Sequence, residues 1–417
     1  MKSLDEPRRR TGACGTLRRF CSPHTARQAL VAAAVTLAGA FSACAAPYLP
    51  ADDAQVLERL PTAGNQNLRE LRRLHADLAR NPGDLALAIR VATQDIEAAR
   101  AESDPRYNGY AEAALGPWIA LPSPPNAVLL LRATLRQTTH DFHGALKDLN
   151  RVISTDPRNL QARLTRAIIL QVVGEYPDAL KNCFSLALFA DNLVATTCIA
   201  SVNGLNGHAQ ASREALQDAL DRAGADESPQ LRLWALTILA EIDARAGDGV
   251  AAEGHFRQAL ALGLRDGYLL SAYADFLLDA GRPQEVLVLL ANESRIDALL
   301  LRLALAEQML GTRALSQHIF ELSERFHMSR LRSDTSHQRE AARFTLHLLK
   351  RAPEALQLAE QNWSAQHEPW DARILLEAAL ASGASIAARP VLEWLRTSQL
   401  EDSQIRSLAA RLREVPQ

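Results

Sequence analysis

A repeat of about 34 residues between Asn126 and Phe320 constrains this 417-residue chain more than any other feature. Small residues recur at one phase, with steps of 34, 33, 40, 34 and 30, and a glycine follows five of them seven positions later. A fixed period of this length is typical of helical hairpins that stack one on another. The small residues are Ala133, Ala167, Ala200, Ala240, Ala274 and Ala304, and the glycines are Gly174, Gly207, Gly247, Gly281 and Gly311.

The composition favours helices over strands. Only 5% of the residues are aromatic, whereas 47% are hydrophobic, and Ala and Leu dominate that fraction. Small residues on facing helices let the two axes approach to the close end of roughly 8–10 Å. A glycine between the helices permits a tight turn, because it adopts positive φ without strain. We therefore expect an all-α fold.

Individual units carry a recognisable residue pattern. The unit Asn126–Asn159 has bulky, small and aromatic residues, and a final proline, in the order of a tetratricopeptide repeat, which the chain resembles. The resemblance implies a right-handed superhelical solenoid of antiparallel hairpins that binds a protein or peptide. It is clear over residues 126–321, and it leaves 45–125 and 322–417 as degenerate repeats or caps. The matching residues of this unit are Leu129, Ala133, Phe142, Ala145, Leu149, Val152 and Pro157.

Residues 1–44 have the order of a bacterial export signal. An arginine-rich lead precedes an uncharged run over residues 29–43, which is shorter than the roughly 20 residues of a membrane span. Phe41-Ser42-Ala43-Cys44 resembles a lipoprotein box, which implies lipidation at Cys44, whereas Ala43-Cys44-Ala45 reads as an ordinary cleavage site. We expect an exported, periplasmic protein, with membrane contact only through such an anchor.

Charge and cysteine content limit the partners and the compartment. Residues 1–44 carry seven basic and two acidic side chains, or +5, so the total of −2 leaves −7 for the remainder. An acidic body argues against nucleic acid, whose binding depends on phosphate contacts. Cys183 and Cys198 fall on adjacent helices of successive hairpins; they form a disulfide in an oxidising compartment, or serve as two small buried hydrophobes.

The sequence carries no pattern for catalysis. It has no glycine-rich phosphate loop, no His-Glu-x-x-His and no Cys-x-x-Cys, so we expect no enzyme activity, cofactor or metal. We expect His140 and His143, which flank a carboxylate on a turn, to be solvated surface residues. Four tryptophans are expected to be core residues: Trp118, Trp363, Trp370 and Trp394.

The resemblance implies that the first helix of each hairpin lines a concave groove. Steps of three and four residues return to one helix face, so the second, fifth, ninth and twelfth places of each unit form a stripe. Glu241 and Asp275, flanked by aromatic residues, are expected to hold a basic or extended peptide; the alternative is an ordinary solvated face. The stripe lacks the Lys/Asn arrangement with which some relatives clamp a carboxylate. It comprises Gln137, Gln171, Thr197, Ser201, Trp234, Thr237, Glu241, Tyr268, Ser271 and Asp275.

Three functions follow from this interpretation. The first is an exported scaffold that binds a protein or peptide, such as an assembly factor for an envelope complex. The second is a structural envelope lipoprotein that spaces other components and has no ligand in its groove. The third is an enzyme or a regulator of one, which requires a catalytic set that the sequence does not display.

Overall fold

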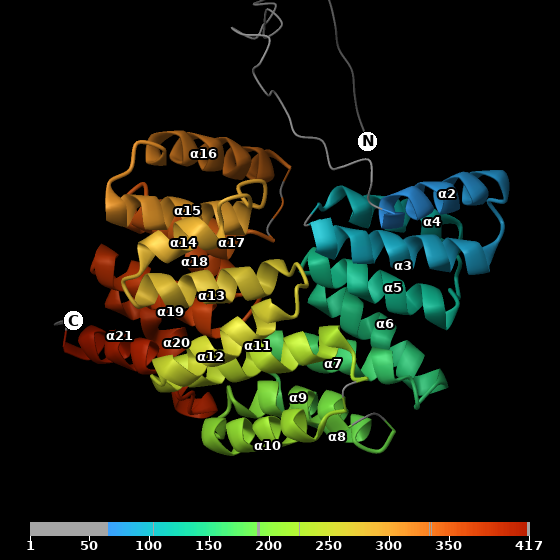
Figure 1. The fold of residues 1–417 in the computed structure, drawn as a ribbon, viewed down its shortest axis with the longest axis horizontal. Coiled ribbons are helices and arrows are strands. Elements are labelled where there is room, and N and C mark those ends of the chain that lie inside the picture. The colour runs from blue at the N-terminus through green and yellow to red at the C-terminus, as the bar shows by residue number, and fades with distance from the viewer. Residues whose placement is uncertain are drawn as a thin grey trace, which may run out of the picture. The chain divides into compact units, whose positions relative to one another are not determined.

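The computed structural model describes residues 66–102, 104–189, 192–224, 226–332, 334 and 336–414. The predicted export signal and the predicted lipidation site at Cys44 lie outside these residues. Residues 64–417 form one compact unit, and the described part of it contains twenty α-helices, one short 3-10 helix and no strand (Figure 1). The all-α prediction is therefore confirmed. None of the helices in the described ranges combines the length and apolar character that crossing a membrane requires.

The helices follow one another at the spacing that the repeat predicts. The repeat phase of the sequence places further units at Leu160, Leu233 and Gly267. Helices start at Asn126, Leu160 and Gly267, whereas the helix expected from Leu233 starts at Pro229. The bounds are α2 (Gln66–Arg80), α3 (Leu85–Glu102), α4 (Arg106–Ile119), α5 (Asn126–Thr138), α6 (Phe142–Thr155), α7 (Leu160–Val172), α8 (Tyr176–Leu186), α9 (Asn192–Asn203), α10 (Ala209–Arg222), α11 (Pro229–Ala246), α12 (Gly249–Ala261), α13 (Gly267–Asp279), α14 (Pro283–Leu289), α15 (Asp297–Leu310), α16 (Leu315–Leu331), α17 (Gln338–His347), α18 (Ala352–Trp363), α19 (Pro369–Ser382), η1 (Ser385–Ala388), α20 (Arg389–Ser398) and α21 (Ser403–Glu414).

Consecutive helices pair as hairpins, and each hairpin packs on the next. The turns form as the sequence predicts: all five repeat glycines adopt positive φ, between 67° at Gly281 and 90° at Gly247. The six alanines of the repeat are almost completely buried. Side chains such as Asp141 and Asp248 cap the second helices by accepting hydrogen bonds from backbone N–H groups three residues later. The result is a tetratricopeptide-like array.

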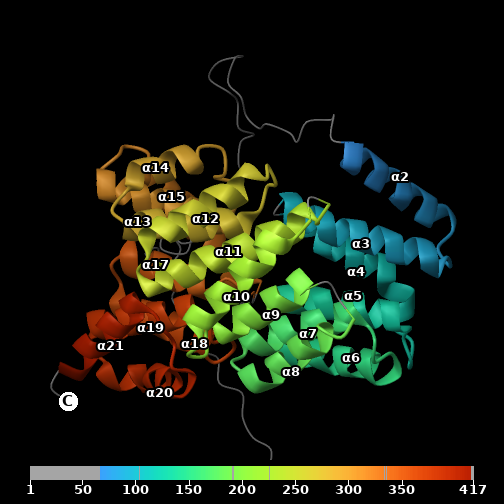
Figure 2. The same ribbon diagram turned by 60° about the horizontal axis from the view of Figure 1, so that its bottom comes forward.

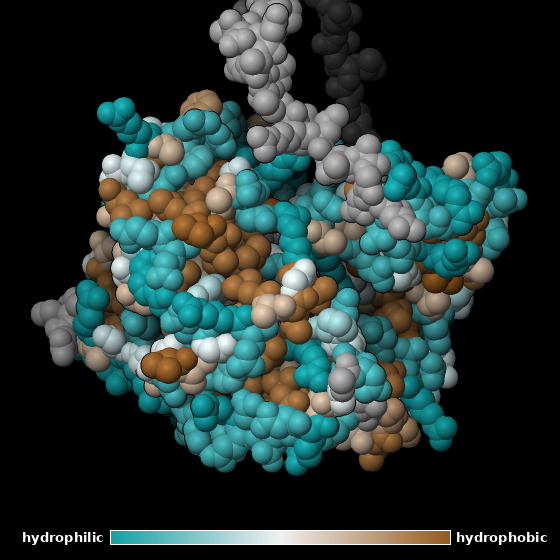
Figure 3. Space-filling view, viewed as in Figure 1, coloured by the Kyte–Doolittle hydropathy of each residue, from teal (hydrophilic) through white to brown (hydrophobic). Residues whose placement is uncertain are grey.

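The hairpin α13–α14 departs from the regular pattern. Its second helix, α14, has only seven residues. A shorter second helix covers less of its neighbours, and hydrophobic side chains gather on the surface over α13 and α14 (Figure 3). Val288, on α14, is 80% exposed.

The last helices of the array return to the hairpins near its middle. The loop between α18 and α19 lies against the turn of the α7–α8 hairpin, where the backbone N–H of His367 donates to the carbonyl of Val172 at 2.7 Å. Farther on, Glu401 accepts a hydrogen bond from the backbone N–H of Ala209 at the start of α10. Figures 1 and 2 show α18–α21 beside α7–α11. The array therefore closes on itself through contacts that its period does not predict.

A disulfide joins two successive hairpins. Cys183 on α8 and Cys198 on α9 are bonded, with their Cα atoms 5.4 Å apart. Both are buried in the same hydrophobic cluster, which also contains residues of α17–α21. Of the two alternatives for this pair, the structure has the disulfide.

Aromatic side chains mostly occupy the positions expected of core residues. Trp363 is buried, and its ring meets that of Trp394 edge to face at 5.4 Å. Trp118 packs against the core of the N-terminal helices. Trp370 is different, because it lines a cavity. His140 is also not a freely solvated residue: it stacks on Phe142, and burial lowers its pKa.

Candidate functional site: a cavity lined by the first helices

The first helices of the hairpins surround a cavity with a volume of about 910 Å³. Residues of α3, α5, α7, α9, α11, α13, α15, α17, α19 and α21 line it, whereas α12 supplies only Gly249 and Phe256 from a second helix. Its volume lies within the range of about 300–1,000 Å³ that is typical of ligand sites. As expected, the inner wall of the array is built from first helices.

Seven of the ten expected groove residues line this cavity. They lie on five successive first helices, of which α13 alone supplies three. Gln171 accepts a hydrogen bond from the hydroxyl of Ser201 at 2.8 Å, so two neighbouring units are joined inside the cavity. The seven are Gln137, Gln171, Ser201, Glu241, Tyr268, Ser271 and Asp275. That they bind a partner stays a prediction.

The other three residues of the expected stripe do not line the cavity. Thr197 and Thr237 are buried, and each hydroxyl donates to the carbonyl four residues earlier in its own helix, at 2.6 and 2.8 Å. Trp234 packs against the hydrophobic cluster that contains the disulfide. The prediction that these three residues face a groove is wrong. The expected stripe used four places in each unit. Closely packed first helices expose fewer places than that to the cavity, because neighbouring helices cover the rest.

Asp275 is part of a buried ionic cluster rather than a free acid. Its carboxylate accepts hydrogen bonds from Arg302 on α15 at 2.6 Å and from Arg343 on α17 at 2.8 Å, and all three side chains are buried. Burial opposes ionisation, but the two guanidinium charges outweigh it and lower the pKa of Asp275. The expectation that this residue pairs with a basic peptide is therefore wrong, since its charge is already balanced.

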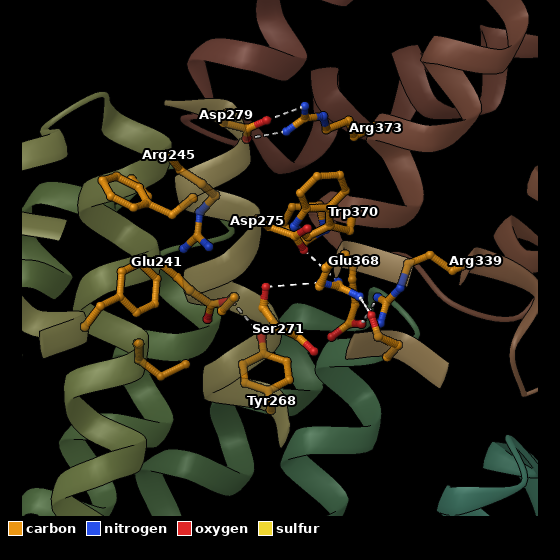
Figure 4. A pocket seen from close by; sticks show the side chains of 18 of the residues that line it. Glu241, Arg245, Tyr268, Ser271, Asp275, Asp279, Arg339, Glu368, Trp370 and Arg373 are labelled. Atoms are coloured by element: carbon orange, nitrogen blue, oxygen red, sulfur yellow. Dashed lines mark hydrogen bonds and ion pairs between the residues drawn. The ribbon is translucent and has the colours of Figure 1, made fainter. Parts of the chain in front are cut away.

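A stacked tryptophan extends this cluster to α19. The guanidinium groups of Arg343 and Arg373 lie over the ring of Trp370, at 4.0 and 4.2 Å from its centroid. Arg373 also forms a bidentate ion pair with Asp279 of α13. Figure 4 shows Trp370 and the Arg373–Asp279 pair on one side of the cavity. The wall formed by α13, α15, α17 and α19 is thus held by paired charges.

A second set of paired charges holds the start of α19. Glu368 and Asp371 form a capping box, in which each side chain accepts a backbone N–H of the other residue. Arg339 of α17 donates to Glu368 at 2.9 Å and lies 3.5 Å from Asp371. Asn362 also donates to Asp371 at 2.8 Å. These bonds fix Glu368 and Arg339 at the edge of the cavity opposite Glu241 (Figure 4).

The wall around Glu241, Tyr268 and Arg245 carries polar groups whose hydrogen-bonding capacity is only partly used by contacts within the protein. The Tyr268 hydroxyl donates to Glu241 at 2.7 Å, while 55% of the Tyr268 residue is exposed. Burial raises the pKa of Glu241, partly offset by the charge of Arg245 and by the Tyr268 hydrogen bond. Arg245, four residues after Glu241 on α11, also lines the cavity. Figure 4 shows its guanidinium group pointing inward.

Sequence patterns missed several residues of this wall. Arg245 had a signal, because it follows Glu241 by four residues and therefore shares its helix face. Trp370, Arg339 and Arg373 had none, because they belong to the C-terminal helices, whose place in the cavity wall depends on the closure of the array.

The structure resembles solved helical-repeat proteins at low identity. A chain of the APC/C hetero-tetramer Cut9–Hcn1 aligns with 80% of this chain and 64% of its own length, at 14% identity and a TM-score of 0.46. Human IFIT1, in a dimer with m7Gppp-AAAA, aligns at 13% identity over 83% and 87%, with a TM-score of 0.43. A tetratricopeptide repeat protein from Parabacteroides merdae aligns at 15% identity over 75% and 99%, with a TM-score of 0.34.

The matched region spans less than two thirds of the Cut9–Hcn1 chain. No family model matches the sequence, and no curated protein matches it. With TM-scores below 0.5, these neighbours do not indicate what this chain binds.

Proposed function

We propose that this chain is a non-enzymatic scaffold that binds an extended segment of a partner protein in the cavity lined by its first helices. The observation that carries the proposal is the row of polar residues that four successive first helices present to the cavity: Gln137, Gln171, Ser201 and Glu241. Amide, hydroxyl and carboxyl groups repeated along a wall match the regular donors and acceptors of an extended backbone. Asp275 stabilises the wall rather than the ligand.

The chemistry of the wall supports binding rather than catalysis. Among the described residues that line the cavity there is no His, Cys or Lys. Its acids Asp275, Asp279 and Glu368 form ion pairs with arginines. A general base or nucleophile needs a neighbour that tunes its reactivity, and the paired acids are instead engaged in holding helices together.

Export to the periplasm is part of the proposal. The order of residues 1–44 supports it. The Cys183–Cys198 disulfide supports an oxidising compartment, where such bonds persist. A structural spacer that leaves the cavity without a ligand is the alternative.

Photo-crosslinking tests this function against the alternative. A benzoylphenylalanine at Gln137 or Ser271, inside the cavity, is expected to crosslink a partner in living cells; at Val288, which is 80% exposed on α14, it is not. Mass spectrometry of the adducts identifies the crosslinked segment. Adducts only at Val288, or none at any position, would favour the spacer.

A further inference from the structure

Arg245 is an arginine of the cavity wall that makes no close ion pair with the described residues, although its charge acts on Glu241 and Asp402. No carboxylate of the described residues lies within 4.0 Å of its guanidinium group, and its Nε atom is buried without a hydrogen-bond acceptor. Taking a charge out of water without compensation costs several kcal/mol. A partly buried guanidinium without a contacting carboxylate therefore leaves room for a counter-ion supplied by a ligand.

Three of the other four arginines that line the cavity differ from Arg245, and the fourth, Arg100, is exposed to water. Arg302, Arg339 and Arg373 each contact a carboxylate at 2.6–2.9 Å. These pairs connect neighbouring helices, so their role in the fold is clear. Arg245 makes no such connection, although its long side chain reaches into the same cavity (Figure 4).

The ordinary partner of Arg245 is present but engaged elsewhere. Glu241 lies four residues before it on α11, the arrangement in which a glutamate and an arginine normally pair on a helix surface. Instead, Glu241 accepts the Tyr268 hydroxyl of α13 at 2.7 Å. Glu241 is thus influenced by the charge of Arg245 without pairing with it directly, and the N–H donors of Arg245 remain available to a ligand.

We propose that Arg245 binds a carboxylate of the protein segment that enters the cavity. This inference rests on the proposed function and names the chemistry of its ligand. A guanidinium group matches a carboxylate in planar, bidentate geometry. The same group also accepts phosphate, but the residues that line the cavity include seven Asp or Glu and five Arg. This acidic excess repels anions, and it disfavours a doubly charged phosphate more than a singly charged carboxylate.

The surroundings of Arg245 also indicate what flanks the carboxylate. Ile238 on α11 and Phe276 on α13 line the cavity together with the exposed ring of Tyr268. Apolar and aromatic surface of this kind favours an apolar neighbour. The segment we expect therefore carries an acidic group beside an apolar side chain.

Selection from a random peptide library tests this inference even while the partner is unidentified. The full protein is incubated with hexapeptides that have either free or amidated C-termini, and the retained peptides are sequenced. The variants are Arg245→Gln, Arg245→Lys and, as the matched control, Arg222→Gln. Arg222 lies on α10 with a side chain that is 65% exposed. Melting temperatures are measured for all variants, and that of Arg245→Gln is expected to change little, because this side chain makes no close ion pair with the described residues.

The wild type and the control Arg222→Gln are expected to enrich carboxylate-bearing peptides at least tenfold. Arg245→Gln is expected to lose this enrichment. Enrichment of Asp or Glu in both libraries identifies a side-chain carboxylate; enrichment confined to free C-termini identifies the terminal one. Arg245→Lys is expected to retain part of the enrichment. Peptides selected equally by Arg245→Gln overturn this inference but leave the proposed function in place. Competition by inorganic phosphate at the concentration of the carboxylate peptide also overturns it, and selection of no peptide contradicts both proposals.

Discussion

Trp394 of α20 donates its indole N–H to the hydroxyl of Tyr176 on α8 at 3.1 Å, although 218 positions separate them in the sequence. Tyr176 is buried. The bond joins the end of the helical array to its middle, and it lies beside the disulfide in one hydrophobic cluster.

Tyr176→Phe is expected to lower the free energy of unfolding by about 1–3 kcal/mol, because the indole N–H loses its acceptor. Chemical denaturation monitored by tryptophan fluorescence measures the change. Tyr110→Phe is the control, since Tyr110 lies on the surface of α4 and is 51% exposed. If Tyr176→Phe and Tyr110→Phe change the free energy of unfolding equally, the hydrogen bond between Trp394 and Tyr176 does not contribute to stability.

Alanine substitutions at Gly174 and Gly247 distinguish the effect of the α18–α19 loop from the effect of backbone strain, because only Gly174 lies against that loop. Both adopt positive φ, 83° and 90°, so an alanine at either position is expected to cost about 1–2 kcal/mol. A Cβ at Gly174 would also meet Nδ1 of His367 at 3.1 Å, whereas a Cβ at Gly247 meets nothing within 4 Å. Gly174→Ala is therefore expected to destabilise more than Gly247→Ala, as measured by denaturation midpoints. A larger loss for Gly247→Ala would contradict the placement of the loop.

The Cys183–Cys198 disulfide predicts a redox-dependent stability. The bond closes a loop with a sequence separation of 15 residues, for which the chain-entropy estimate is about 3 kcal/mol. The double variant Cys183→Ser/Cys198→Ser and the reduced wild type are both expected to melt at a lower temperature than the oxidised wild type. A reducing agent should leave the melting temperature of the double variant unchanged, and a shift there would point to another cause.

Asp275 shows where reasoning from the sequence succeeds and where it stops. Its inward position follows from the repeat, because equivalent places on successive first helices face the same side. Its charge state does not follow, because Arg343 lies 68 positions away and reaches it only through the return of the C-terminal helices. The turn at Gly281 is local and was predictable. The last helix, α21, has no place in the repeat and was not predicted.

Asp275→Asn is accordingly a test of the fold rather than of partner binding. Loss of the carboxylate charge leaves the buried Arg302 and Arg343 without their ion-pair partner, which typically costs about 3–5 kcal/mol. The expected result is a large fall in melting temperature. Glu241→Gln, on the less constrained wall, is expected to change it little. If Asp275→Asn melts like the wild type, the ionic cluster does not hold α13, α15 and α17 together.

Glu377 predicts a loss of stability in acid. Burial opposes its ionisation, but the hydrogen bond with His347 and the charge of Arg373 prevail and lower its pKa to about 2. An unfolded glutamate titrates at about 4.3, so the folded state binds fewer protons between these values. This contribution is fully present above the unfolded pKa and is lost as the pH falls toward 2; it amounts to no more than about 3 kcal/mol. Denaturation of the wild type and of Glu377→Gln from pH 6 to pH 2.5 measures it. At pH 6 the wild type is expected to have the larger free energy of unfolding, and this difference from Glu377→Gln is expected to disappear in acid. A difference that stays constant across the range would exclude Glu377 as the source of the acid-dependent loss.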